Sequence, residues 1–308
     1  MYQTNAAHII SADSDGRFAN PLDVTVSLLV AGDEAEVLEF LAQRPIHTVT
    51  MMSMINDNGI VSPLNRGTFY GCRDCKGQLE GVALIGHATL LETVSDRALR
   101  ALAEVARDCN FTHMIMAEKE RVADFWEYYI DAGVQRRLAC REWLYEQRWP
   151  IAVSEPISGL KLATEAELDA VMPIQAELAF QESGVNPLDV DPAGFRQRCL
   201  RRISLGRTWV LIEDGELIFK ADVISKTSEV IYLEGIWVNE KRRHDGTGLR
   251  CMNQLSQVLL QQTRSLCLLV NENNQQAQQF YTKCGFLYRS TYETIFLPQK
   301  ESALKVID

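Results

Sequence analysis

The chain has 308 residues, 46% of them hydrophobic and 23% charged, with a formal net charge of −10. Against a prior of about 150 residues per domain, this length and ordinary globular composition predict two domains. The acidic balance argues against a nucleic-acid-binding protein, because such proteins present a basic face to the phosphates.

Residues 1–20 are predicted to be an N-terminal extension. They lack the basic stretch and apolar core of a secretory signal, and no apolar run elsewhere approaches the roughly 20 residues of a membrane helix. We therefore expect a cytoplasmic protein with no membrane contact, whose eight scattered cysteines stay reduced. The close pair Cys72 and Cys75 has no second pair at zinc-ligand spacing, so we predict no metal site.

Residues 21–150 are predicted to form one domain of helices and strands. Apolar residues at helical spacing indicate the helices EAEVLEFLAQ, SDRALRALAEVARD and RVADFWEYYIDAG, the second opening on Ser95 as an N-cap. Strand patterns occur in GTFYGCRDCKGQLEGVALIG, where two strands flank a turn, and in HMIMA and CREWLYEQRW. A linker follows at RWPIAVSEPISG, where two prolines separate apolar segments.

Residues 151–308 repeat much of this order and are predicted to form the second domain. A short strand LKLA precedes a helix that opens on Thr164, with Glu167 placed for a capping box, and the helix DPAGFRQRCLRRISLG follows. Alternating apolar residues around Asp214-Gly215 predict a hairpin. The remaining elements are a strand VIYLEGIWV, a helix after Gly248, a strand SLCLLV, a helix QQAQQFYTKCG and a final strand pair in FLYRSTYETIFL. The shared order suggests two related domains in tandem.

The segment VNEKRRHDGTGLRCMNQL places two glycines, Gly246 and Gly248, directly before the apolar stripe of a helix. A helix start leaves backbone N–H groups without internal partners and carries partial positive charge. Glycine lets the backbone approach a ligand closely, and Arg242 and Arg243 add charged donors. This chemistry suits a pyrophosphate, although the spacing fits neither a Walker loop nor a Rossmann motif. On these residues alone, a plain tight turn is at least as good an interpretation.

A second motif, VNENNQQAQQFYTKCGF, follows about thirty residues later. Together with Arg243-x-x-Gly246-x-Gly248 after the strand LEGIWV, it resembles the GNAT superfamily of acyl-CoA-dependent N-acyltransferases. The second motif matches the family pattern at Asn274, Ala277, Tyr281, Gly285 and Phe286. The resemblance covers residues 157–297 and is closest to bacterial two-domain GNAT proteins whose first half has no assigned function.

The resemblance implies an α/β fold of two tandem GNAT-like domains, each with a mixed central sheet flanked by helices. Residues 151–308 would be the catalytic domain. Residues 21–150 would be a degenerate copy, because GHATLLETVSDRALRAL runs from strand to helix without a glycine loop.

The resemblance also implies acetyl-CoA as the acyl donor. Its pantetheine arm would pair with the backbone of residues 236–238, and its pyrophosphate would lie on the loop at 243–248. Asn274 would contact the donor or cap its helix, and the two roles are compatible. The expected cofactor-binding residues are Ile236, Trp237, Val238, Arg243, His244, Gly246, Thr247, Gly248 and Asn274.

The loop departs from the family pattern at His244 and Asp245, where a glycine and a basic residue are usual. A carboxylate that points at a pyrophosphate would weaken CoA binding, whereas an outward-turned Asp245 would leave the contacts to backbone N–H groups. His244 is expected to be a solvated loop residue.

Tyr281 is the predicted general acid, because a phenol can protonate the departing thiolate. The alternative is a core tyrosine on the same helical face as Ala277 and Phe280. Glu234 is the predicted base, with cation binding or a satisfied polar network as alternatives. Glu182 and Lys220 are further candidates for the substrate site.

The sequence therefore predicts an N-acetyltransferase that moves acetyl from acetyl-CoA to a primary amine of a small molecule or peptide, by direct attack in a ternary complex. The first alternative is a non-enzymatic acyl-CoA sensor. The second is a tandem transferase with an aminoacyl donor carried by RNA, which the acidic balance and the intact CoA motifs disfavour.

Overall fold

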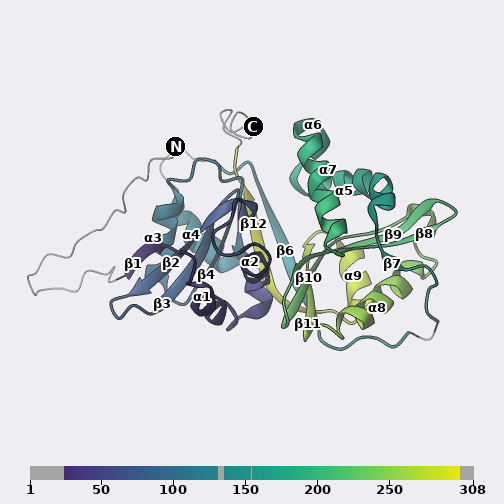
Figure 1. Cartoon of the computed structure of the whole chain (residues 1–308), viewed down its shortest axis with the longest axis horizontal. Helices are drawn as coiled ribbons and strands as arrows, with labels where there is room; N and C mark the ends of the chain where they lie inside the picture. Colours follow the sequence, from purple (N-terminus) through teal and green to yellow (C-terminus); the bar gives the residue numbers. More distant parts are fainter. Residues whose placement is uncertain (1–23, 131–134, 154, 299–308) are drawn as a thin grey trace, which may run out of the picture.

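The computed structural model describes residues 24–130, 135–153 and 155–298. Its strands form one mixed sheet in the order β1-β2-β3-β4-β5-β12-β6-β11-β10-β9-β8-β7, with helices on both faces (Figure 1). This arrangement confirms the predicted fold class. Within the described ranges, no helix is long and apolar enough to cross a membrane.

The first half builds the sheet from β1 to β5. Strands β1 to β4 are antiparallel neighbours, and β5 lies parallel to β4. The strands are β1 (Val24–Leu28), β2 (Gly67–Asp74), β3 (Leu79–Gly86), β4 (Ala88–Thr93), β5 (Met114–Glu118) and β6 (Leu138–Gln147). The helices are α1 (Glu34–Leu41), α2 (Pro45–Asn58), η1 (Pro63–Asn65), α3 (Asp96–Ala106) and α4 (Lys119–Tyr129).

The second half repeats this plan, with β11 parallel to β10 and antiparallel pairing from β10 to β7. The strands are β7 (Lys161–Leu162), β8 (Thr208–Glu213), β9 (Glu216–Lys226), β10 (Val230–Val238), β11 (Ser265–Asn271) and β12 (Leu287–Phe296). The helices are η2 (Glu165–Glu167), α5 (Leu168–Ser183), α6 (Pro187–Val190), α7 (Pro192–Ser204), η3 (Glu240–Arg242), α8 (Thr247–Leu259) and α9 (Gln275–Lys283).

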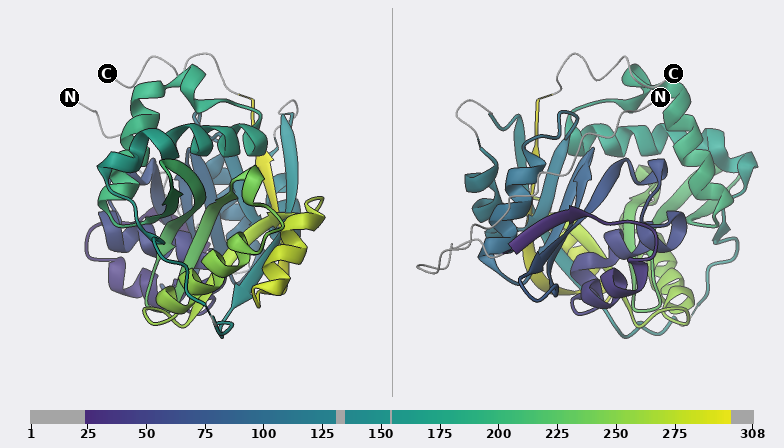
Figure 2. Two further views of the ribbon diagram at one scale, coloured as in Figure 1. Left: turned by 90° about the vertical axis from the view of Figure 1, so that its right-hand side faces the viewer. Right: turned by 60° about the vertical axis from the view of Figure 1, so that its left-hand side comes forward.

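Each half packs helices on both sides of its strands (Figures 1 and 2). On β3, Val82 and Leu84 join the core under α1 and α2, whereas Ala83 and Ile85 join the core under α3 and α4. The alternation follows from the pleat, which sends successive side chains to opposite faces. In the second half α5 and α7 form one such core and α8 and α9 the other.

The two halves exchange their last strands. Strand β12 pairs with β5 of the first half, and β6 pairs with β11 of the second half, so that β12 and β6 become neighbours in the middle of the sheet. The sheet therefore crosses the predicted boundary at residue 150. The division into domains 21–150 and 151–308 stays a prediction.

Each parallel pair of strands is hydrogen-bonded over a short stretch, and beyond it the two strands separate. Strands β4 and β5 pair only from Ala88–Leu90 to Met114–Met116, and β10 and β11 pair only from Val230–Tyr232 to Ser265–Cys267. Beyond Tyr232, β10 carries a bulge around Gly235, which has a φ of +60°. The opening leaves an unpaired strand edge in each half, and this edge positions the candidate sites.

Most predicted elements are present, including the Ser95 N-cap, the Thr164–Glu167 capping box and the turn at Asp214-Gly215. The predicted final strand pair is wrong, since residues 287–296 form the single strand β12. Helix α2 was not expected. It lies over the centre of the sheet, where its Val49 shares a core with Leu144, Val230, Cys267 and Tyr292.

Candidate functional site

The start of α8 offers free hydrogen-bond donors beside open space. Gly246 precedes the helix with a φ of +86°, and a Cβ added there would meet nothing within 4 Å. The backbone N–H groups of Gly248 and Leu249 have no hydrogen-bond partner among the described residues. Free N–H groups at a helix start bind anions, so this loop fits a pyrophosphate.

Gly248 has a second, structural reason to be glycine. A Cβ at this position would lie 2.8 Å from Cγ2 of Val238 at the end of β10. The absence of a side chain therefore lets the first turn of α8 pack directly on the strand that carries residues 236–238.

Asp245 turns toward the helix start rather than outward. Its carboxylate accepts hydrogen bonds from the backbone N–H of Thr247 at 2.8 Å and from Nε of Arg242 at 2.7 Å. These two bonds lower the pKa of Asp245 to about 2. The carboxylate therefore stays charged and occupies one of the N–H donors that a pyrophosphate would use.

The arginine at the loop is Arg242 and not Arg243, which the family pattern had indicated. Arg242 lies at the loop, where it also contacts Glu213 and the hydroxyl of Thr247. Arg243 instead donates from Nε to the carbonyl of Val238 at 3.2 Å and pairs with Glu240. His244 adopts a left-handed conformation with a φ of +69°. The predicted roles of Arg243 and His244 in phosphate binding stay predictions, and Arg242 has the better geometry.

Residues 236–238 follow the bulge in β10. Trp237 and Val238 pair with Lys220 and Phe219 of β9 on one side. The pairing with β11 has ended at Tyr232 on the other side. This edge can hydrogen-bond an extended ligand as a further strand would, which is the arrangement expected for a pantetheine arm.

Asn274 caps α9, because its side-chain oxygen accepts a hydrogen bond from the N–H of Ala277 at 3.0 Å. Tyr281, on the same helix, is only 9% exposed and packs edge-on against Phe280 and Phe286, with ring centroids 5.2 and 5.9 Å apart. Burial raises the pKa of its phenol well above the usual value. The hydroxyl makes no hydrogen bond to any described residue, so its proton is free for a ligand.

Three glutamates converge on the open side of the second half. Glu234 lies on β10 just before the bulge, Glu182 near the end of α5, and Glu142 on β6. Burial raises the pKa of Glu142 to about 7. Glu182 is accessible to solvent, yet the surrounding protein and the charges of Glu234 and Glu142 raise its pKa to about 8. Burial likewise raises the pKa of Glu234, against the opposing charge of Arg202.

The sequence motifs do not indicate Glu142 as a site residue, because they lie in the second half and Glu142 belongs to the first. It reaches this place through the strand exchange, where β6 pairs with β11 at Asn271. No local pattern in CREWLYEQRW signals that pairing.

Lys220 is fully buried and does not line an open site. Its ammonium donates to Gln175 at 2.6 Å, to Asp222 at 2.5 Å and to the carbonyl of Gly235 at 3.2 Å. Arg202 completes the network with a 2.9 Å bond to Asp222. The geometry gives Lys220 a structural position that holds the bulge, and its assignment to the substrate site finds no support there.

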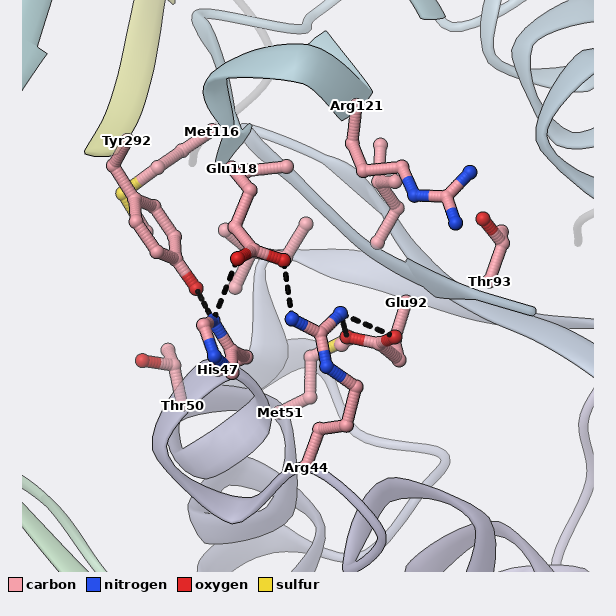
Figure 3. Close-up of a pocket in the computed structure, with 13 residues that line it drawn as sticks. Arg44, His47, Thr50, Met51, Glu92, Thr93, Met116, Glu118, Arg121 and Tyr292 are labelled. Carbon is pink, nitrogen blue, oxygen red and sulfur yellow. Dashed lines mark hydrogen bonds and ion pairs between the residues drawn. The ribbon is translucent and has the colours of Figure 1, made fainter. Parts of the chain in front are cut away.

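The first half has a polar pocket at the corresponding opening (Figure 3). Glu92 lies two residues beyond the last parallel pair of β4, as Glu234 does on β10. In the pocket Arg44 pairs with both Glu92 and Glu118. His47 contacts the hydroxyl of Tyr292 at 2.9 Å and Glu118 at 3.6 Å.

This pocket is small, and its charged side chains pair largely with one another. Its cavity is about 30 Å³, enough for a water molecule or two. Helix α3 begins next to it without a glycine loop, and Ser95 caps its first turn by accepting from Ala98. The pocket therefore lacks the donor-binding features of the second half.

Metal ligation has no support among the described residues, in which no group of three or more His, Cys, Asp and Glu side chains can hold an ion. Cys72 is buried in β2 and Cys75 is exposed in the following turn. Burial raises the pKa of Cys72 to about 12, so this thiol stays protonated.

Residues 172–286 match the family model of the Acetyltransferase (GNAT) family. The matched segment contains both motifs, from α5 through β10, α8 and α9 to Phe286. It confirms the resemblance of this half to the GNAT superfamily. No curated protein matches the chain by sequence.

Solved structures extend the likeness of the fold to most of the chain. A Drosophila protein superposes with a TM-score of 0.64 at 12% identity, over 89% of this chain and 99% of its own. A tandem GNAT protein from the clavulanic acid biosynthesis pathway gives 0.55 at 14% identity, over 90% and 100%. A GNAT-family acetyltransferase from Colwellia psychrerythraea gives 0.55 at 13% identity, over 89% and 100%. At these identities the comparison shows a shared fold, including the tandem arrangement.

Proposed function

We propose that the protein is an N-acyltransferase that moves an acetyl group from acetyl-CoA to a primary amine by direct attack in a ternary complex. The observation that carries this proposal is the start of α8. Free N–H groups and open space at Gly246 lie there, after β10 and next to the place where β10 and β11 stop pairing. The match of this segment to the GNAT family model supports it. We keep the cytoplasm as the compartment.

The chain offers acetyl-CoA a place for each part of the molecule. The N–H groups of Gly248 and Leu249 suit the pyrophosphate, and Arg242 adds a nearby positive charge. The free edge of β10 at residues 236–238 suits the amide groups of the pantetheine arm. When bound, acetyl-CoA supplies the acyl group as a thioester with a thiolate leaving group.

The chemistry needs one proton acceptor and one proton donor. Burial raises the pKa of Glu234, so its carboxylate is a stronger base than a free glutamate, and it takes a proton from the ammonium of the acceptor to leave a neutral amine. The neutral amine attacks the carbonyl carbon of the thioester, the C–N bond forms as the C–S bond breaks, and the second proton on nitrogen is lost to solvent as the amide forms. Tyr281 keeps its proton until this point because burial raises its pKa, and it then protonates the thiolate.

The acceptor carries a second positive charge in this proposal. The surrounding protein and the charge of Glu234 raise the pKa of both Glu142 and Glu182, and the charge of Glu142 adds to the shift of Glu182. Neither carboxylate forms an ion pair with a basic side chain among the described residues. A cationic group placed between them would relieve their repulsion. Acceptors with two amines, or peptides with a nearby lysine or arginine, therefore fit better than neutral amines.

The test combines binding with turnover. Calorimetric titration with acetyl-CoA is expected to give one site per chain, and Gly246→Val is expected to abolish it by filling the space beside the N–H groups. Gly77→Val is the matched control, because Gly77 also has a positive φ of +81° and open space but lies far from the loop. Thiol release over a panel of amines then measures transfer. Intact binding in Gly246→Val, or two sites per chain, would contradict the proposal.

A non-enzymatic acyl-CoA sensor is the second candidate, and one observation favours it. Asp245 holds a negative charge on a donor that the pyrophosphate would use. The same experiment separates the candidates: a sensor binds acetyl-CoA at one site but releases no thiol with any amine.

A further inference from the structure

A wide groove runs between the two halves, on the side where α7 lies (Figure 1). It has a volume of ≈ 1870 Å³. Helices α6 and α7 of the second half form one wall. The opposite wall comes from the first half, from the loops before β2 and β4 and from the connection between α3 and β5. The groove is separate from the loop at Gly246 and from the pocket at His47.

The groove is positively charged in a chain of net charge −10. Six arginines line it, against three carboxylates, from Glu104, Asp108 and Asp191. Three of these arginines are paired: Arg198 with Asp191, Arg202 with Asp222 and Arg207 with Asp57. Arg66 and Arg107 have no ion pair and no side-chain hydrogen bond with a described residue. Burial lowers the pKa of Arg66, and the neighbouring charge of Arg198 lowers it further. The groove therefore holds two cationic side chains, Arg66 and Arg107, that no described residue pairs directly, although the charge of Asp191 acts on Arg66 from nearby.

His87 also lines the groove, close enough to Arg66 and Arg198 to interact with their charges. Its ring stacks on that of His113 with centroids 5.0 Å apart. Burial lowers the pKa of His87 to about 3, and the charges of Arg66 and Arg198 contribute. Both histidines line the groove.

Apolar side chains are exposed on both walls. Leu64 is 56% exposed and Phe111 54% on the first half, and Leu205 is 49% exposed on α7. A single-stranded nucleic acid would need several aromatic faces for stacking, and Phe111 is the one large exposed aromatic among the described lining residues. The carboxylates of Asp108 and Asp191 would also repel closely spaced phosphates. A polypeptide with spaced acidic and apolar side chains fits this mixture better.

We propose that this groove binds an acidic polypeptide segment, with carboxylates on Arg66 and Arg107 and apolar side chains on Leu64, Phe111 and Leu205. The proposal goes beyond acyl transfer and does not require it. Arg202, one of the lining residues, bonds Asp222, the cross-strand neighbour of Glu234. This bond links the groove to the strand that carries the proposed base.

The probe is a fluorescein-labelled peptide in which glutamate alternates with leucine and phenylalanine, titrated with the full chain in the absence of acetyl-CoA. We expect saturable binding that weakens with salt and weakens by about tenfold or more in the double variant Arg66→Glu, Arg107→Glu. Arg196→Glu is the matched control, since Arg196 lies exposed on α7 outside the groove lining, and it should bind like wild type. Circular dichroism checks that each variant folds.

Three results would overturn the proposal. The first is equal binding by the double variant and the control. The second is equal binding of a peptide with glutamine in place of glutamate. The third is tighter binding of a single-stranded RNA of the same length, with the same dependence on Arg66 and Arg107. Because no acyl donor is present, these results leave the proposed transferase activity untouched.

Discussion

The ring of Tyr281 packs like a core residue, but its hydroxyl has no partner among the described residues. Replacing only the hydroxyl therefore separates the two interpretations. In Tyr281→Phe the ring keeps its contacts with Phe280 and Phe286, so we expect little change in thermal stability or in acetyl-CoA affinity. The turnover number should fall by about 10- to 1000-fold, as for the loss of a general acid. Steady-state kinetics with saturating amine gives this value.

Near-wild-type turnover in Tyr281→Phe would remove the phenol from the mechanism and leave water as the proton donor. A lower melting temperature with unchanged turnover would assign the residue to the core alone. The sequence motif predicts Tyr281 as the general acid, and the structure adds that no described residue already uses its proton.

The glutamate cluster predicts a pH dependence of acceptor choice. Because burial raises the pKa of Glu142 to about 7 and that of Glu182 to about 8, both are mainly neutral at pH 6 and mainly charged above pH 8. As the pH rises through this window, a diamine should therefore become a better acceptor relative to an amino alcohol of equal length. We expect kcat/KM for the diamine relative to the alcohol to increase by about three- to tenfold.

Glu142→Gln should flatten this pH profile and leave the amino alcohol nearly unaffected. The raised pKa of Glu142 also affects the stability of the fold, which should fall as the pH rises. A carboxyl whose pKa is higher in the fold than in the unfolded chain contributes stability that is lost as the pH rises through the folded value. Glu142→Gln should therefore raise the melting temperature more at pH 8.5 than at pH 6. An unchanged pH profile in Glu142→Gln would exclude the carboxylate from acceptor binding.

At the scale of elements, the loop before α8 shows what a motif can and cannot predict. The glycine spacing correctly predicts that a helix starts here, although α8 begins at Thr247 rather than after Gly248, and Gly246 before it is left-handed. It does not predict that Asp245 turns inward to the N–H of Thr247 and to Arg242. It also does not predict that Arg242 lies at the loop beside Glu213 while Arg243 donates to the backbone carbonyl of Val238. Tertiary partners decide the orientation of a long charged side chain.

Asp245→Asn tests whether the inward carboxylate weakens donor binding. Asparagine can still accept the hydrogen bond from Thr247, but it removes the negative charge and one of the two carboxylates that hold Arg242, the other being Glu213. We expect acetyl-CoA to bind about three- to tenfold more tightly at low salt, with a smaller gain at high salt because of screening. Asp214→Asn, in the turn between β8 and β9, is the control for a lost surface charge. Weaker binding in Asp245→Asn would mean that the charge organises the loop for its ligand.

Helix α2 shows why local sequence patterns do not predict every element. Its sequence PIHTVTMMSMINDN is rich in β-branched residues, and its buried positions include Thr48 and Ser53 as well as Val49. Such a helix has no clean polar face, because it packs against both the first half and strands β9 and β10. Missing α2 also hid His47 and Arg44, which approach Glu118 only in three dimensions.

At the scale of the whole molecule, the strand exchange makes the two halves depend on each other. Local periodicity predicts β6 as a strand and a strand pair where the single strand β12 lies, but it contains no information on their partners, which lie far apart in sequence. The exchange buries Leu144 and Tyr292 in one core with Val230 of β10. It also brings Glu142 of the first half to the proposed acceptor site of the second.

We therefore expect that residues 151–308 expressed alone do not form a native domain. Without residues 24–147, β12 loses both of its partners, β5 and β6, and β11 keeps β10 on one side only. The exposed edges and apolar faces should leave the fragment aggregated or without near-ultraviolet circular dichroism. Co-expression with residues 1–150 should restore a soluble complex that binds one acetyl-CoA. A protease site placed in the linker near Trp149, which is 82% exposed, provides the control, because the cleaved halves should stay together through their exchanged strands. If residues 151–308 alone were monomeric, cooperatively folded and able to bind acetyl-CoA with wild-type affinity, the paired strands would not be required for the fold, and the boundary at residue 150 would separate two autonomous domains.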